Sequence, residues 1–286
     1  MSMSDRPFHV PQRPSAIPVR YVAWLAYDGT DYVGWQVQPH GRSIQGELEA
    51  VIERLTGCRT RAHASGRTDA GVHAHEQPVH FDLPTQLDLN RFLLGLNALL
   101  PADIRVWRVR TAPLTFHARY SALAKEYRYH IYNGPVWDPC LRRYTCWERR
   151  PLDLDAMRAA AKHLVGQHDF AAFAANPHRE VHGTVRTLWS LDVHRRGPLV
   201  TIVARADGFL YRMVRSLAGF LLRVGRNEVP PATAEAILHS RVRTARVPTA
   251  APQGLFLWKV QYPRNAFHKT NARDPVVEHP STVPPE

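Results

Sequence analysis

A single carboxylate, Asp69, stands in a short segment bounded by Gly66 and Gly71, with Arg67 two residues before it. Glycine adopts backbone angles that other residues avoid, which favours a shaped loop. Loops held by a rigid scaffold often carry catalytic groups, and such an aspartate can act as a nucleophile or a general base. The alternative is a hairpin turn whose carboxylate accepts backbone hydrogen bonds, with the arginine a solvated surface charge.

Two arginines form a second group of candidate residues, Arg212 and Arg215, in the apolar segment 208–225. Apolar residues cover most of its helix circumference, which predicts a largely buried helix. A guanidinium beside a buried face is costly unless it meets an acid or a phosphate. Arg215 is therefore a candidate partner for Asp69, and the alternative is an arginine that reaches back to the surface.

A tyrosine is the third candidate. Tyr127, Tyr129 and Ile131 alternate along the segment 125–132, which indicates a strand with one aromatic face. An aromatic ring can stack on a nucleobase in RNA-binding proteins. The spacing alone favours a core tyrosine with a bonded hydroxyl.

The charge of the chain indicates a polyanionic partner. The net charge is +12 and the isoelectric point is near 10.1. Residues 1–115 hold 12 arginines against 11 acidic residues, a net +1, whereas residues 116–286 hold 25 basic against 14 acidic residues, a net +11. We expect the second half to supply most of the attraction for nucleic acid, while Asp69 lies in the nearly neutral half.

Length and composition exclude several classes of protein. A chain of 286 residues with 44% hydrophobic residues predicts one large or two ordinary domains with a sizeable core. There is no long apolar run and no secretory signal, so no membrane span is expected. Cys58, Cys140 and Cys146 form no Cys-x-x-Cys pair, which favours reduced thiols, a cytoplasmic location and no cysteine-based zinc site.

Hydrophobic periodicity predicts the elements that must position these residues. In the first half we expect strands at 20–27, 59–63, 75–81 and 103–109, and helices at 44–56 and 88–100. In the second half we expect strands at 125–132, 185–193, 199–206 and 254–262, and helices at 153–164, 208–225 and 230–240. Both halves share a loose strand–helix–strand–strand–helix–strand order. This predicts α+β domains at 19–115 and 116–264, between a disordered proline-rich leader, 1–18, and a polar tail, 265–286.

The segment 64–74, Ala-Ser-Gly-Arg-Thr-Asp-Ala-Gly-Val-His-Ala, resembles the signature of the bacterial tRNA pseudouridine synthase A family. Other motifs similar to that family follow in its order, over roughly residues 20–262. They are Gly-Trp-Gln-x-Gln at 34–38, Tyr-x-Tyr at 127–129, His-Asp-Phe at 168–170, Met-Val-Arg at 213–215 and Gly-Leu-x-Leu at 254–257.

The resemblance implies a fold and an activity. The fold would be two similar ferredoxin-like domains that form one continuous, mostly antiparallel sheet, with helices on one side and a basic cleft at the junction. The activity would be the isomerisation of uridine to pseudouridine at positions 38, 39 and 40 in the anticodon stem-loop of tRNA. The protein would be a homodimer that needs no cofactor and no metal.

The resemblance also implies roles for residues. Asp69 would be the nucleophile or base, and Arg215 would hold its carboxylate by a forked contact. Tyr127 would stack on the target base, and Arg67 would fill the space that the base leaves or hold a phosphate. Substrate-binding residues would also include Gln36, Arg212 and Leu255, the last as an apolar floor.

Three other interpretations remain open at the level of the sequence. The first is a non-catalytic RNA-binding protein of the same fold. The second is a metal-dependent phosphoesterase built from Asp69 with His63, His73, His75 and His80. The third is a synthase that acts on another RNA.

Overall fold

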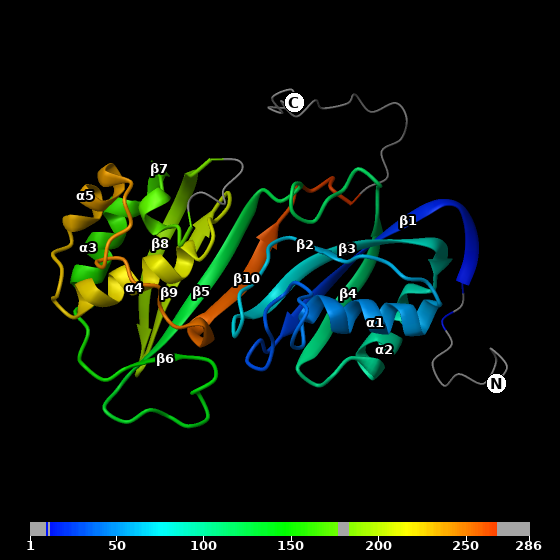
Figure 1. Ribbon diagram of the computed structural model, residues 1–286, viewed down its shortest axis with the longest axis horizontal. Coiled ribbons are helices and arrows are strands. Elements are labelled where there is room, and N and C mark those ends of the chain that lie inside the picture. The colour runs from blue at the N-terminus through cyan, green and yellow to red at the C-terminus, as the bar shows by residue number, and fades with distance from the viewer. Residues whose placement is uncertain (1–9, 11, 177–182, 268–286) are drawn as a thin grey trace.

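The structure, a computed structural model, describes residues 10, 12–176 and 183–267 (Figure 1). A ten-stranded sheet runs through this part of the chain in the order β4-β1-β3-β10-β5-β9-β8-β7, with β2 beside β3 and β6 beside β5. The strands are β1 (Gln12–Tyr27), β2 (His63–Ala64), β3 (His73–Leu87), β4 (Ile104–Ala112), β5 (Ala124–Asn133), β6 (Cys146–Glu148), β7 (Gly166–Asp169), β8 (Val185–Arg196), β9 (Leu199–Ala206) and β10 (Leu255–Gln261). The helices are α1 (Ile44–Thr56), α2 (Leu89–Leu99), α3 (Leu154–Leu164), α4 (Met213–Gly225) and α5 (Thr233–Ser240).

The two halves of the sheet repeat one arrangement. The strands of the N-terminal half lie side by side in the order β4-β1-β3-β2, and β10-β5-β9-β8 is the corresponding order in the C-terminal half. When the four strands of each half are counted along the chain, the fourth lies beside the first, the first beside the third and the third beside the second. Strand pairs are antiparallel except β3 with β10 and β5 with β6. Figure 1 shows α1 and α2 against the N-terminal strands and α3, α4 and α5 against the C-terminal strands. The predicted α+β fold with two similar ferredoxin-like halves is confirmed.

The halves meet where β3 pairs with β10. Phe256 faces His73 and Leu257 faces Ala74 in this short parallel ladder. One cluster of buried hydrophobic residues continues from one half into the other. The start of β3, directly after the Asp69 loop, is thereby fixed against the start of β10.

Local sequence signals set the helix ends. The Ser43 side chain accepts a hydrogen bond from the Gly46 amide at the start of α1, and Gly57 ends this helix with a φ of 73°. Asp88 and Asp153 cap α2 and α3 in the same way.

The helix expected from residue 208 begins only at Met213. Arg212 has a φ of 58°, a left-handed conformation that cannot continue an α-helix. The apolar residues before it belong to a packed loop, in which Leu210 is buried and Phe209 contacts Tyr127. The prediction was therefore wrong for 208–212, because loop residues extended the apolar pattern.

Both predicted ends of the folded region need correction. β1 begins at Gln12 and pairs with the end of β3, so 12–18 is not a leader. Pro14 fits because the register shifts between it and Val19, where a missing amide donor is tolerated. Phe267 packs against Trp24, so the tail does not begin at 265. The rest of the predicted leader and tail, 1–9, 11 and 268–286, lies outside the described residues.

Three smaller findings concern other predictions. The strand expected at 59–63 is limited to β2, two residues long. The three cysteines are free thiols. No helix in the described ranges has both the length and the apolar character needed to cross a bilayer.

Candidate active site

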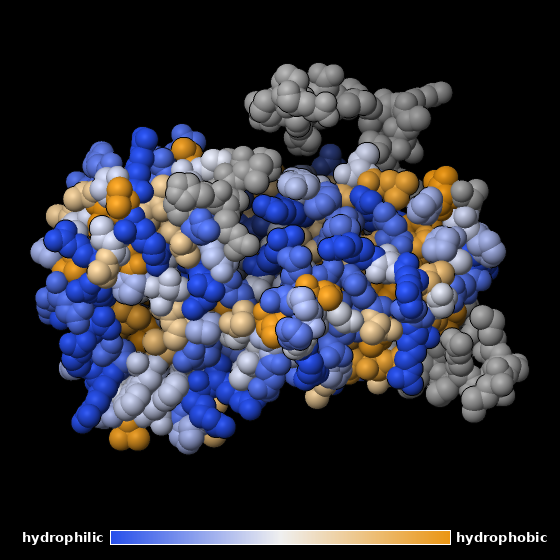
Figure 2. All heavy atoms as spheres, in the orientation of Figure 1, coloured by the Kyte–Doolittle hydropathy of each residue, from blue (hydrophilic) through white to orange (hydrophobic). Residues whose placement is uncertain are grey.

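A cleft of about 800 Å³ opens where the two halves meet. Six of the predicted site residues line it: Asp69, Arg67, Tyr127, Leu255, Gln36 and Arg212. Asp69 is the single carboxylate among the described residues that line the cleft. Five basic side chains also line it: Arg61, Arg67, Arg119, Lys125 and Arg212. Figure 2 shows hydrophilic side chains over much of this face of the molecule, including the region between the halves. The predicted basic cleft at the junction is confirmed, and both halves contribute cations to it.

Two arginines hold one oxygen of the Asp69 carboxylate. Arg215 Nη1 donates to Asp69 Oδ2 at 2.8 Å, and Arg212 Nε lies 3.5 Å from the same oxygen. The forked contact expected from Arg215 is wrong, because its Nε donates instead to the Ala250 carbonyl at 2.8 Å. Within the described chain, no hydrogen bond or ion pair reaches Asp69 Oδ1, and the side chain is 20% exposed. One carboxylate oxygen is thus fixed and the other is available to a substrate.

Arg215 lies behind the cleft. Only 9% of this residue is exposed, on the buried helix α4, and its own carbonyl accepts from the Ala250 amide at 3.0 Å. The guanidinium is therefore anchored to backbone on one side and to Asp69 on the other. The surface-reaching alternative for Arg215 is wrong, because the acid lies within hydrogen-bond distance.

The Asp69 loop is held closely against the segment that follows β1. Gly34 and Asp69 form an isolated antiparallel bridge, and the Trp35 amide donates to the Thr68 carbonyl at 3.0 Å. Gly34 has a φ of 112°, and a Cβ there would lie 2.6 Å from the Thr68 oxygen. Gly71 has a φ of 74°, as expected of a shaped loop, whereas Gly66 does not have a positive φ.

A buried polar network supports the loop from below. The hydroxyls of Tyr27 and Thr68 lie 2.8 Å apart, and Gln77 Nε2 donates to the Gly66 carbonyl at 2.6 Å. Ser65 Oγ donates to Gln77 Oε1 at 2.7 Å. Burial raises the pKa of Tyr27 to about 12, so its hydroxyl stays protonated and can donate. The loop is therefore fixed by hydrogen bonds on both sides of Arg67.

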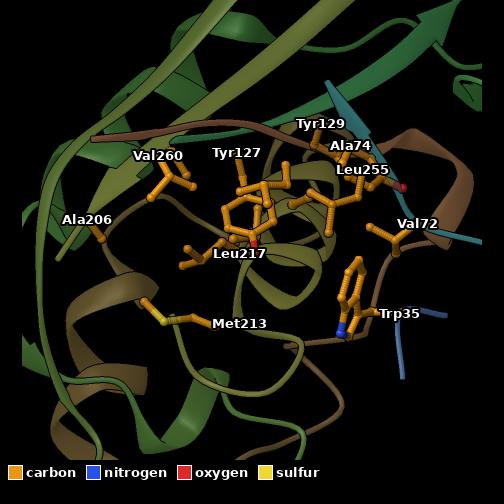
Figure 3. Close-up of a cluster of buried hydrophobic side chains, with 14 of the residues drawn as sticks. Trp35, Val72, Ala74, Tyr127, Tyr129, Ala206, Met213, Leu217, Leu255 and Val260 are labelled. Atoms are coloured by element: carbon orange, nitrogen blue, oxygen red, sulfur yellow. The ribbon is translucent and has the colours of Figure 1, made fainter. Parts of the chain in front are cut away.

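Tyr127 lies at the inner end of the cleft. Figure 3 shows it among buried side chains, beside Leu217 and Leu255. The residue is 8% exposed, and the Phe209 ring contacts its ring edge to face, with the two ring centroids 5.1 Å apart. Burial, with the nearby Tyr27 and Asp69, raises the pKa of its hydroxyl far above the ordinary value. Its hydroxyl has no hydrogen-bond partner among the described residues, so the expected bonded core tyrosine is wrong in that respect.

The other predicted site residues differ in exposure. Arg67 is exposed, and Gln36 is half-buried. Leu255 is buried at the cleft wall, where β10 begins. The structure therefore brings the predicted positions together at one cleft, with Arg215 in contact with Asp69 rather than with the cleft itself.

The histidines of the phosphoesterase alternative do not gather around Asp69. Both ring nitrogens of His73 form hydrogen bonds with backbone groups. Nδ1 accepts from the Gly29 amide at 3.0 Å, and Nε2 lies 2.9 Å from the Arg143 carbonyl oxygen. His75 stacks on Trp258. No group of three or more potential ligands suited to a metal ion occurs in the described residues. The geometry therefore gives this alternative no support.

Several site residues were missed by the sequence prediction. Lys125 lines the cleft, and strand alternation places it on the face of β5 that carries Tyr127. That alternation was visible in the sequence. The contacts of Gly34 with the loop and of Arg215 with the Ala250 carbonyl depend on tertiary packing, which leaves no local signal.

Comparison with known proteins identifies the family of the chain. A family model described as tRNA pseudouridine synthase matches residues 23–121 and 160–263. The tRNA pseudouridine synthase A of Brevibacillus brevis is 44% identical over 238 residues, which cover 83% of this chain and 97% of that protein. The namesakes from Moorella thermoacetica and Chlamydia trachomatis are 45% and 43% identical and are covered over 97% and 92% of their lengths. Because the matches span both halves and the cleft between them, the chain belongs to the tRNA pseudouridine synthase family.

Proposed function

We propose that this protein isomerises uridine to pseudouridine at positions 38, 39 and 40 in the anticodon stem-loop of tRNA. The observation that carries the proposal is the Asp69 carboxylate, with Oδ2 held by two arginines and Oδ1 facing a basic cleft. Family membership and relatives named for this activity support it. A non-catalytic RNA-binding protein would gain nothing from a carboxylate here, because it repels phosphate.

The reaction breaks the N1–C1′ bond of the nucleotide, rotates the base and joins C5 to C1′. Nothing is oxidised or hydrolysed overall, so a positioned carboxylate is the main chemical requirement. Asp69 Oδ1 can attack the sugar or the base, or remove the C2′ proton. Arg215 and Arg212 contact Oδ2 of the carboxylate and so fix its direction.

The target base must leave the helical stack, because stacking hides its glycosidic bond. Arg67 is exposed beside Asp69 and has no hydrogen bond or ion pair with a described residue, so it can fill the vacated space or hold a phosphate. Tyr127 and Leu255 contact the extruded base, and Gln36 contacts the substrate near the mouth. Little of the Tyr127 ring is exposed, so full stacking on it requires a shift of Phe209.

The homodimer and the cytoplasmic location implied by the resemblance are also part of the proposal. Free cysteines fit a reducing compartment. Sedimentation equilibrium tests the dimer, and a mass equal to that of one chain at micromolar concentration would contradict it.

The experiment that tests the proposal uses tRNA transcripts in which uridine 38, 39 or 40 is replaced singly by cytidine. We expect pseudouridine at each remaining uridine of this set and at no other position. Pseudouridine outside the anticodon arm would indicate a synthase acting on another site, and tRNA binding without any pseudouridine would indicate a binding protein. Activity in EDTA, which we expect to be unchanged, separates the proposal from the phosphoesterase alternative.

A further inference from the structure

We propose that Lys125 binds a backbone phosphate of the RNA next to the target nucleotide, an inference that rests on the proposed function. Lys125 lines the cleft from β5. Its Nζ donates to the Ser65 carbonyl at 2.5 Å, which occupies one of its three N–H donors. No other hydrogen bond and no ion pair joins this ammonium to a described residue.

The surroundings of Lys125 are short of negative charge. Burial first, and then the charges of Arg119 and Arg186, lower its pKa to about 8. Along β5, the neighbouring acid Glu126 points to the other face and pairs with Arg128 at 2.9 Å. A half-buried ammonium that meets only a carbonyl and two cations is unfavourable in the free protein. An arriving phosphate would supply the missing opposite charge.

The position of Lys125 also specifies which phosphate it can reach. A Cβ on Gly66 would lie 3.6 Å from Lys125 Nζ and 3.5 Å from Tyr127 Oη, so both groups border the same small space over Gly66. Tyr127 and the Asp69 loop border the place for the target nucleotide. A phosphate that contacts Lys125 must therefore belong to that nucleotide or to its neighbour.

A lysine that serves only to tie β5 to the loop is the competing explanation. The Ser65 contact fits that role, but a neutral donor would make the same bond without burying a charge. The two explanations differ in their dependence on charge. Only a phosphate contact contributes to the salt dependence of binding and responds to the charge of a single RNA linkage.

The test compares Lys125→Met and Lys125→Gln with Lys162→Met, which removes the same charge from an exposed position in α3 outside the cleft. We expect both Lys125 variants to weaken tRNA binding about tenfold. They should also lower the slope of log Kd against log salt by about 0.7 to 0.9. Lys162→Met should change neither quantity. Thermal unfolding identifies a variant that fails to fold, and Lys125→Gln can keep the Ser65 bond if Lys125→Met does not fold.

The decisive arm uses RNA with one neutral methylphosphonate at the linkage on the 5′ or the 3′ side of the target uridine. We expect one of these substitutions to weaken binding to the wild-type protein about tenfold and to have no further effect on Lys125→Gln. Equal losses in both proteins at both linkages would overturn the inference. Wild-type protein that binds with this pattern but forms no pseudouridine would instead contradict the proposed function.

Discussion

Arg215 Nη1 lies 2.8 Å from Asp69 Oδ2, although the two residues are 146 positions apart in the chain. Asp69 belongs to a loop of the N-terminal half and Arg215 to helix α4 of the C-terminal half. The site is therefore complete only when both halves are folded and joined through β3 and β10.

Replacing Arg215 by lysine tests this relationship. Lysine keeps the charge but cannot serve both the Asp69 carboxylate and the Ala250 carbonyl. We expect turnover to fall roughly 100-fold, with tRNA affinity within about threefold of wild type. The matched control is Arg223→Lys on the same helix, where the guanidinium pairs with Glu228 outside the cleft. Equal activity in the two variants under single-turnover conditions would contradict the role of Arg215.

Gly34 gives a prediction about backbone shape. Gly34→Ala combines an unfavourable φ of 112° with a Cβ only 2.6 Å from the Thr68 oxygen, so the Asp69 loop must shift. We expect a large loss of turnover and a loss of about 1–3 kcal/mol in unfolding free energy. Gly197→Ala is the control, because it has a φ of 58° but no atom within 4 Å of the new Cβ. It therefore measures the cost of the positive φ without the steric clash. Full activity in Gly34→Ala would show that loop position is not critical.

The hydroxyl of Tyr27 lies beneath the loop, 2.8 Å from Thr68 Oγ1. Tyr27→Phe should cost about 1–2 kcal/mol of stability and should also lower turnover, because the loop loses a buried support. Tyr21→Phe removes a hydroxyl bonded to Thr85 and Leu87, away from the cleft. Urea unfolding and single-turnover assays on both variants should give similar stability losses, but an activity loss in Tyr27→Phe alone.

The buried histidine His80 predicts acid sensitivity. Burial and the neighbouring charges of His117, Arg20 and His63 lower its pKa to about 3. The unfolded chain takes up this proton near pH 6.5, so between these values the unfolded state binds more protons than the folded state. The free energy of unfolding therefore decreases as the pH is lowered through this range. This histidine contributes at most about 1.4 kcal/mol per pH unit to the decrease.

His80→Gln checks this prediction, since its amide oxygen can still accept from the Ala118 amide, which donates to His80 Nδ1 at 3.2 Å. Urea unfolding of the variant between pH 7 and pH 5 should show a smaller pH dependence than that of the wild type. An identical pH dependence in both proteins would mean that His80 is protonated in the folded state within this range.

The sequence predicted the fold well because its signals are local. The Ser43 cap, the Gly57 end and the apolar stripe between them specify α1 from one short segment. The leader was wrong because prolines at 14 and 18 suggest an unpaired chain, whereas a register shift accommodates this part of β1 beside β3. Partners across a sheet have no signature in either strand alone.

The site shows the same division. The positions of Asp69 and Arg215 followed from the loop motif and from the cost of a buried guanidinium. The sequence did not predict that Arg215 contacts only one oxygen of the Asp69 carboxylate, because this depends on the Ala250 carbonyl, which accepts from Arg215 Nε. Lys125 was overlooked because a lysine at the start of a strand is usually a solvated charge.

Single-turnover release of tritium from C5-labelled tRNA by Asp69→Asn, with tRNA binding measured in parallel, tests the central claim most directly. This substitution keeps the shape of the side chain and removes the charge that meets Arg215 and Arg212. We predict no detectable release, with Kd within about tenfold of wild type, or about 1.4 kcal/mol. Release at a rate near that of the wild type would contradict the assignment of the bond chemistry to Asp69.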